Sequence, residues 1–309
     1  MNGGVIYRVR LMIEGILHEG LIYGILALGV FITFRILDFP DLTVDGSFPM
    51  GAAIMAASLV NGYSMWFALL LALAGGIVAG IVTALIHNKL KVPNLLAGIL
   101  TMTMLYSVNI RILGNRANVP LLNENTILSS VVSLTEGFLP KEWALLLFFL
   151  LVVGFLVFLL TLFFHTDLGL TIGAMGNNQQ MVISQGTNPE ILKIIGVGLS
   201  NGLVAISGAF AAQYQGFADV SLGKGIIISG LASVMIGEFF VRTHRISVLL
   251  LRVVVGAIVF KGLMYLGRYY GYYINMTPND LKLITGLLII FSLIMTQVRM
   301  KKRKKQEAT

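Results

Sequence analysis

The 309-residue sequence contains no cysteine and few charged residues. Without cysteine, the chain has no disulfide, no thiolate metal site and no cysteine nucleophile. Only 12% of the residues are charged and 57% are hydrophobic, whereas charged residues make up about 25% of an ordinary soluble domain. Because so few charged groups cannot cover a water-facing surface, the composition indicates a protein that resides in lipid.

Recognisable catalytic motifs are also missing. No lysine is followed by serine or threonine, so the phosphate-binding pattern GxxxxGK[ST] is absent and the chain cannot be its own P-loop ATPase. The four histidines, at positions 18, 87, 165 and 244, do not have the HExxH spacing of a zinc protease. We therefore expect no catalytic residue, no metal site and no cofactor.

Long apolar runs dominate what is present. A helix needs about 20 apolar residues to cross the hydrocarbon core, and continuous rather than alternating runs favour helices over a β-barrel. We predict an all-α, polytopic membrane helix bundle with about eight full spans and a broken or half-length helix near 46–60. The predicted full spans cover residues 20–34 (extended back toward Leu11), 66–86, 94–110, 143–164, 194–218, 225–240, 252–267 and 283–298.

Basic residues set the expected orientation. Six of them lie in the tail 299–309, and a basic tail beside an apolar span is typical of a cytoplasmic anchor near anionic headgroups. This placement also puts the loop 165–193 in the cytoplasm. It favours contact with membrane lipid over nucleic-acid binding, and it leaves the side of the N-terminus open.

Glycine pairs spaced four residues apart occur at Gly76 and Gly80 and at Gly198 and Gly202. Such pairs let helix backbones approach closely in lipid. We favour ordinary packing within the bundle over a dedicated dimerisation motif.

The segment 166–190 is predicted to be an ordered loop. Asn177 is suited to cap a short helix over 178–185, and Gly186 is suited to the left-handed residue that ends it. Asn188 then caps the next helix, which has Pro189 at its first position. A short helix with caps at both ends holds a fixed position between two spans.

The composition of this loop suggests a docking surface. Residues 176–188 carry no formal charge and mix amides with apolar side chains, which suits an apolar patch with a hydrogen-bonding rim. The alternative is an interfacial helix on lipid headgroups, but such helices usually carry Lys or Arg. The candidate docking residues are Gly176, Asn177, Gln179, Gln180, Met181, Ile183 and Gly186.

Asp38, Asp41 and Asp45 cluster between the first span and a helix that we expect to begin near Ser47. Pro40 and Gly46 should prevent a continuous helix through this segment. Discontinuous helices often form transporter substrate sites, and the start of a helix attracts anions. These four polar residues are therefore candidates for a substrate pathway. A water-exposed loop with three solvated acids is the equal alternative.

Four further charged residues, Arg35, Glu238, Arg252 and Lys261, fall near or within spans. Charges at membrane depth are costly and usually face protein or water. We expect Glu238 to form a structural ion pair with Arg242 or Arg245, whereas Lys261 has no evident partner in the sequence.

Several stretches resemble the permease family of branched-chain amino acid and ribose-type ABC importers. They are IGAMGNN at 172–178 with Gly186, the glycine-rich run at 195–210, GILALG at 24–29 and DLTVDGSFPMGAA at 41–53. GLASVMIGE at 230–238 and PNDLKLITG at 278–286 resemble a subgroup associated with tryptophan- or tyrosine-binding lipoproteins. One departure is that many relatives have arginine at or beside the position of Gly173.

The resemblance implies a permease in the cell membrane of a prokaryote. The expected substrate is a small solute, and an aromatic or branched-chain amino acid is favoured. The resemblance further implies a homodimer, a cytoplasmic P-loop ATPase that holds the loop 166–190, and an extracytoplasmic substrate-binding lipoprotein. A sugar or nucleoside permease is the alternative within the family. Two alternatives lie outside the family. An ion-coupled secondary transporter would need an ionisable site at mid-membrane, for which Glu238 and Lys261 are the candidates. A membrane scaffold or export component would not need an ATPase partner.

Overall fold

A computed structural model of the protein describes residues 2–240, 243, 245–271, 283, 286, 287 and 290. These residues form an almost entirely helical chain. In sequence order the elements are α1 (Asn2–Phe31), the π-helix η1 (Ile32–Ile36), α2 (Val44–Val60), α3 (Met65–Leu90), α4 (Asn94–Ile112), β1 (Asn118–Pro120), α5 (Ile127–Thr135), α6 (Lys141–His165), α7 (Asp167–Asn177), α8 (Gln179–Ser184), α9 (Pro189–Gln215), β2 (Phe217–Asp219), the 3-10 helix η2 (Val220–Gly223), α10 (Ile226–Phe240) and α11 (Ile246–Gly271).

The predicted all-α, polytopic architecture is confirmed. Within the described residues, seven helical segments are long and apolar enough to cross a membrane. The eighth predicted span, 283–298, lies largely outside those residues. The predicted half-length helix near 46–60 is α2, which begins a little earlier, at Val44.

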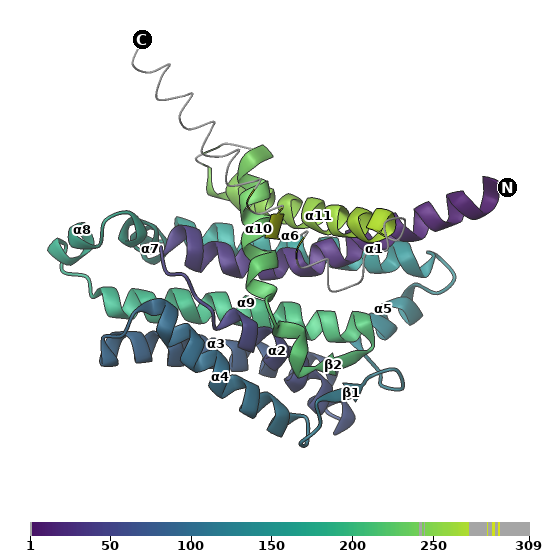
Figure 1. Ribbon diagram of the computed structural model, residues 1–309, viewed down its shortest axis with the longest axis horizontal. Coiled ribbons are helices and arrows are strands. Elements are labelled where there is room, and N and C mark those ends of the chain that lie inside the picture. The colour runs from purple at the N-terminus through teal and green to yellow at the C-terminus, as the bar shows by residue number, and fades with distance from the viewer. Residues whose placement is uncertain are drawn as a thin grey trace, which may run out of the picture.

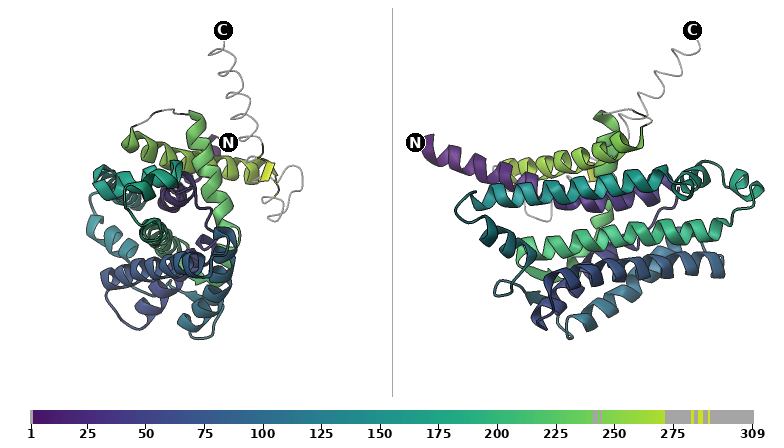
Figure 2. Two further views of the ribbon diagram at one scale, coloured as in Figure 1. Left: turned by 90° about the vertical axis from the view of Figure 1, so that its left-hand side faces the viewer. Right: turned by 180° about the vertical axis from the view of Figure 1, so that it is seen from behind.

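The long helices lie side by side and define two ends of the molecule (Figure 1). The first, which we call the α7–α8 end, carries those two helices. The second, which we call the sheet end, carries α5, β1, β2 and the N-terminus. The turned views agree that α10 does not follow the long helices but runs across them (Figure 2).

A small antiparallel sheet, which the sequence analysis did not predict, closes the sheet end. β1 and β2 pair with Val119 opposite Ala218. The pairing joins the segment after α4 to the end of α9. It thereby satisfies backbone groups that two short connections would otherwise leave to water.

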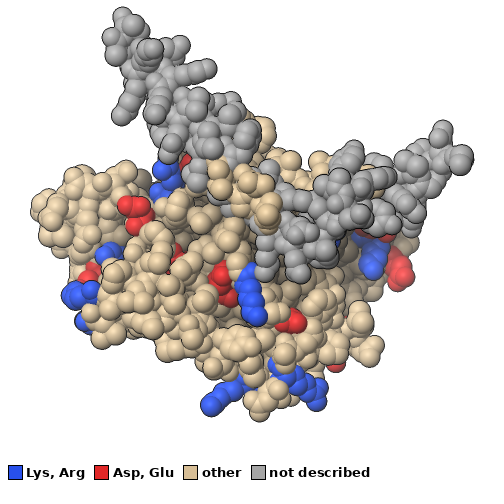
Figure 3. All heavy atoms as spheres, viewed as in Figure 1, with Lys and Arg blue, Asp and Glu red and all other residues tan. Residues whose placement is uncertain are grey.

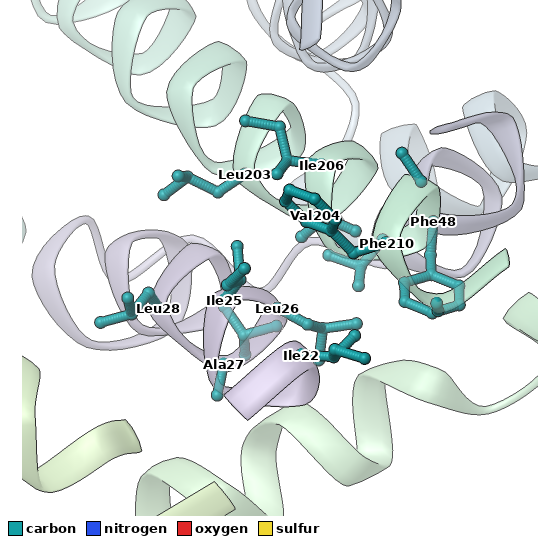
Figure 4. Close-up of a cluster of buried hydrophobic side chains, with 14 of the residues drawn as sticks. Ile22, Ile25, Leu26, Ala27, Leu28, Phe48, Leu203, Val204, Ile206 and Phe210 are labelled. Carbon is teal, nitrogen blue, oxygen red and sulfur yellow. The ribbon is translucent and has the colours of Figure 1, made fainter. Parts of the chain in front are cut away.

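The core forms around α9. Every residue from Ser200 to Gln213 is buried, as expected for a helix that is surrounded by other helices on all sides. Side chains of α1 and α2 converge on it, and Figure 4 shows Ile25 and Leu26 of α1 and Phe48 of α2 beside Val204 and Phe210.

Glycines let the neighbouring backbones approach α9 closely. A Cβ atom on Gly208 of α9 would overlap the carbonyl oxygen of Phe48 in α2, and one on Gly76 of α3 would overlap the carbonyl oxygen of Asn201. A Cβ on Gly80 would likewise meet Val197. The glycine pair in α3 therefore packs within the bundle, as predicted.

The outward faces of α3, α4 and α6 are apolar. Leu70 of α3, Met104 of α4 and Leu151 of α6 are among the large side chains exposed there. Uncharged residues also cover most of the face drawn in Figure 3. Such faces are unfavourable in water and suit lipid or another apolar helix.

Gly208→Ala should destabilise the protein, because the new methyl group must push α9 away from α2. Overpacking of this kind costs about 1–3 kcal/mol, which more than offsets the roughly 1 kcal/mol of helix propensity that alanine gains over glycine. Thermal unfolding in detergent micelles would measure the change.

Gly154→Ala is the matched control, since Gly154 lies within α6 and a Cβ atom there meets no atom within 4 Å. This variant should be as stable as the wild type or more stable. Equal melting temperatures for the two variants would contradict close α2–α9 packing.

Candidate functional site

The loop between α6 and α9 folds into two short helices, each with its own cap. Thr166 accepts a hydrogen bond from the backbone N–H of Gly169 at the start of α7 (3.2 Å). Asn178 accepts one from Met181 at the start of α8 (3.1 Å). Gly186 has φ +79°, the left-handed conformation that ends helices. These contacts make the loop an ordered unit.

The predicted start of the following helix is confirmed. Asn188 accepts a hydrogen bond from the backbone N–H of Glu190 (2.8 Å), and Pro189 occupies the first position of α9. Proline suits this position because the first N–H groups of a helix have no partner within the helix.

The predicted cap of the short helix is wrong by one residue. Asn178, not Asn177, caps it, and the helix covers Gln179–Ser184 rather than 178–185. The reason is that α7, which the sequence analysis did not predict, continues through Asn177, with the Asn178 N–H bonded to the carbonyl of Ala174 (2.9 Å). Asn177 is therefore the last residue of one helix rather than the cap of the next.

The candidate docking residues divide between two sides of the loop. Met181 and Ile183 are 48% and 44% exposed, whereas Val182 between them is fully buried. Gln179, Gln180, Asn177 and Gly186 are also exposed. Gly176 differs, because it packs inward against the backbone of Ile36 in η1. Residues 176–188 thus present an uncharged outer surface, and the contact of Gly176 with Ile36 anchors them on the inner side.

Asp41 lies in the break between η1 and α2 and is buried. Its Oδ1 accepts the backbone N–H of Thr43 (2.9 Å), and its Oδ2 accepts the Nδ2–H of Asn201 in α9 (2.7 Å). Ser47 donates to Oδ1 of the same asparagine (2.7 Å). The first of these bonds forms a side-chain turn just before the helix, and the others fix the start of α2 to the middle of α9.

Asp45 caps the start of a second helix, α10. Its carboxylate accepts the backbone N–H groups of Gly225 (2.8 Å) and Ile227 (2.9 Å), at the start of α10. The first N–H groups of a helix need such partners where water is scarce. Asp45 is thus a cap supplied by a segment about 180 residues away in the sequence.

These contacts correct two expectations for the break. Its helix begins at Val44 rather than near Ser47, and Gly46 lies inside the helix, where a Cβ atom would crowd Leu105 of α4. The picture of three solvated acids is wrong for Asp41, which is 2% exposed. Asp38 is exposed, with φ +51°. A substrate pathway along these residues stays a prediction.

Glu238 forms ion pairs with two residues that were not predicted to be its partners. Its Oε1 lies 2.8 Å from Nε of Arg35 and 3.0 Å from a terminal nitrogen of Arg252. Arg242 lies outside the described residues, and no ion pair joins Arg245 to Glu238 in the described part of the chain. A pair with Arg242 therefore stays a prediction. The two observed partners come from η1 and α11, which helix packing brings to the end of α10.

Lys261 also gains a partner from the fold. Its Nζ lies 3.0 Å from Oε2 of Glu19, whose other oxygen accepts the Tyr265 hydroxyl (2.9 Å). The same ammonium group lies 3.3 Å from the centre of the Tyr23 ring. A charge so compensated can remain in the membrane, and it links α1 to α11.

One pattern missed in the sequence matches GxSxG, the nucleophile elbow of some hydrolases. It is Gly198–Gly202, centred on Ser200, and it lies within α9 rather than at a strand-to-helix turn. Ser200 is fully buried and donates to the carbonyl of Gly29 (2.7 Å). The described residues hold no group of three or more His, Asp or Glu side chains placed to share a metal ion.

Comparison with known proteins identifies one family over most of the chain. Residues 12–293 match the family described as "Branched-chain amino acid transport system / permease component". The chain is 41% identical over 278 residues to the tyrosine transport system permease protein of Clostridioides difficile, covering 90% of this chain and 89% of that one.

More distant similarities extend to other transporters. The autoinducer 2 import system permease protein LsrC of Salmonella typhi is 27% identical over 197 residues, covering 64% of this chain and 54% of that protein. Among solved structures, PsaBC from Streptococcus pneumoniae in complex with Fab superposes with a TM-score of 0.51 at 15% identity, covering 90% of this chain and 89% of that one. This last similarity shows a shared fold.

Exchanging Asp41 and Asn201 should restore stability that either single substitution removes. In Asp41→Asn the backbone N–H of Thr43 holds the amide oxygen, so the new NH₂ group must face the NH₂ of Asn201. In Asn201→Asp two carboxylates meet. Each single variant should lower the free energy of unfolding by about 1–3 kcal/mol, the usual cost of an unsatisfied buried polar group.

In the double variant Asp41→Asn/Asn201→Asp, the new amide at position 41 can donate to the new carboxylate at position 201. That carboxylate can still accept the hydrogen bond from Ser47. The melting temperature of the double variant in detergent should exceed that of both single variants. Additive losses in the double variant would argue against direct pairing of these side chains.

Proposed function

Because the chain belongs to the branched-chain amino acid transport system permease family, we propose that this ABC transporter permease is the membrane-spanning subunit of an amino-acid importer. It is a multi-pass membrane protein and a transport component. Membership of this family implies an ATPase and usually a substrate-binding partner. ATP is hydrolysed on the separate ATPase, since the sequence has no P-loop.

The ATPase docks on the loop 166–190. The observation that carries this proposal is the one-sided exposure of α8, which turns Met181 and Ile183 outward and Val182 inward. An ordered apolar patch rimmed by Gln179 and Gln180, without charge, is suited to protein contact rather than to anionic headgroups. The docking residues are those named from the sequence, except that Gly176 acts from the inner side.

This docking fixes the orientation of the molecule. The α7–α8 end faces the cytoplasm of a prokaryotic cell, and so does the basic tail 299–309, which lies outside the described residues. The sheet end, with the N-terminus, then faces outward (Figure 1). It is the side on which a substrate-binding lipoprotein docks.

The substrate pathway runs between two copies of the permease. The interior around Asp41, Asp45 and Ser47 is occupied by bonds within the chain, so these residues shape the wall of a pathway rather than bind the substrate. Asp38 is exposed beside the break and is the acid available to a substrate ammonium group. Lipid and the second copy share the apolar faces of α3, α4 and α6.

An aromatic amino acid is the proposed substrate. The relative named for tyrosine transport is 41% identical over 90% of this chain, whereas LsrC matches only 64% of it at 27% identity. The greater similarity and coverage favour an amino acid over the solute of the autoinducer 2 system.

Uptake of labelled tyrosine into proteoliposomes that hold the permease, its ATPase and its binding protein should require ATP and persist when ion gradients are collapsed. Unlabelled tryptophan or tyrosine should compete better than leucine or ribose. Uptake that survives ATP depletion and falls with the ion gradient would instead indicate a secondary transporter.

Met181→Asp should abolish uptake and co-purification of the ATPase while membrane insertion and folding are retained. The new carboxylate would be desolvated in the docked interface, at a cost of several kcal/mol if it stays unpaired. Pull-down of the tagged permease and transport assays would measure both effects.

Leu90→Asp is the control. Leu90 is 65% exposed and is the last residue of α3, next to Lys91, which pairs with Glu190 at the start of α9. The substitution therefore places the same charge near the loop but outside it. This variant should retain the ATPase. Normal ATP-driven uptake by Met181→Asp would refute docking on α8.

A further inference from the structure

One of the contacts between the loop 166–190 and the helix bundle is made at η1. A Cβ atom on Gly176 of α7 would overlap the carbonyl oxygen of Ile36 and crowd the carbonyl carbon of Leu37. The two backbones are therefore in direct contact, with no side chain between them to absorb movement. Any displacement of α7 toward the bundle must displace η1.

η1 itself departs from α-helical geometry. The N–H of Leu37 bonds to the carbonyl of Ile32 (3.0 Å), and the N–H of Phe39 bonds to that of Thr33 (2.9 Å). These bonds are wider than the i to i−4 bonds of an α-helix, and such π-helical turns often occur at functional sites. The end of α1 is thus held in a turn that differs from the helix before it.

An ion pair joins η1 to α10. Arg35 of η1 and Arg252 of α11 both reach the same Oε1 atom of Glu238, near the end of α10. The side chain of Arg35 is 60% exposed, whereas that of Arg252 is 8% exposed. Arg252 can therefore hold Glu238 from the buried side, and Arg35 adds a connection to η1.

The other end of α10 is held by Asp45 at the start of α2. Figures 1 and 2 show α10 running across the long helices between these two attachments. Along its length it packs closely on α11, since a Cβ atom on Gly237 would overlap the carbonyl oxygen of Arg252. A helix fixed in this way can carry a displacement from η1 into the bundle.

We propose that Arg35 is a positioning residue that transmits movement of the ATPase-docking loop through η1 to α10. This inference rests on the proposed function and adds a defined route from the loop to the interior. Loss of the Arg35–Glu238 pair should leave the ATPase bound and active while its ATP hydrolysis no longer drives transport.

The test compares Arg35→Ala with Lys91→Ala in proteoliposomes that contain the ATPase and the binding protein. Lys91 forms an ion pair with Glu190 of the same length, 2.8 Å, and similar exposure, which joins α3 to α9. Three quantities are measured: co-purified ATPase, ATP hydrolysis without substrate, and tyrosine taken up per ATP hydrolysed.

Arg35→Ala should retain the ATPase and its basal hydrolysis, and should lower uptake per ATP by about fivefold or more, the lower range of typical coupling effects. Arg35→Lys, which keeps the charge, should give an intermediate ratio. Lys91→Ala should leave the ratio unchanged, as expected for a solvent-exposed pair.

A wild-type ratio in Arg35→Ala, or equal losses in Arg35→Ala and Lys91→Ala, would overturn the transmission role while leaving the proposed function standing. If Arg35→Ala fails to assemble, the ratio in Arg35→Lys decides the question in the same way. Absence of ATP-driven uptake in the wild type itself would refute the proposed function and this inference together.

Discussion

The arrangement of this protein depends on supplying partners for helix ends inside the bundle. α2 and α10 are both short, and each begins where side chains of the chain itself replace water. Asp41 orders the turn before α2 and binds Asn201, while Asp45 accepts two N–H groups from the start of α10. Unsatisfied backbone groups are costly in an apolar setting, so these two carboxylates determine where both helices can lie.

The fold also depends on close contact between helix backbones, and α9 makes the contacts described above with α2 and α3. Gly208 faces the backbone of Phe48, and Gly76 of α3 faces that of Asn201. In lipid, helices associate through packing and polar contacts rather than through exclusion of water. The same contacts bring Asn201 within reach of Asp41 and Ser47. Packing and polar pairing are therefore parts of one structural unit.

Movement in a transporter requires that this unit be connected to the partner that supplies energy. Gly176 rests on the backbone of Ile36, and Arg35 reaches Glu238 on α10, which in turn is held by Asp45. The backbone contact at Gly176 leaves no side chain to absorb a displacement of the loop, and the Arg35–Glu238 pair is the proposed connection from η1 to α10. The exposed side of α8 is the surface on which we propose that the ATPase docks.

The sequence by itself determined the membrane location, the helical class, the ordered loop and its caps at Gly186 and Asn188, because each follows from composition or from residues within one turn of each other. It also pointed to the break near Asp41. Only the tertiary structure decided that Asp45 caps α10 and that Glu238 pairs with Arg35 and Arg252. Those contacts join residues between 14 and about 200 positions apart, and helix packing, which no local pattern encodes, brings them together.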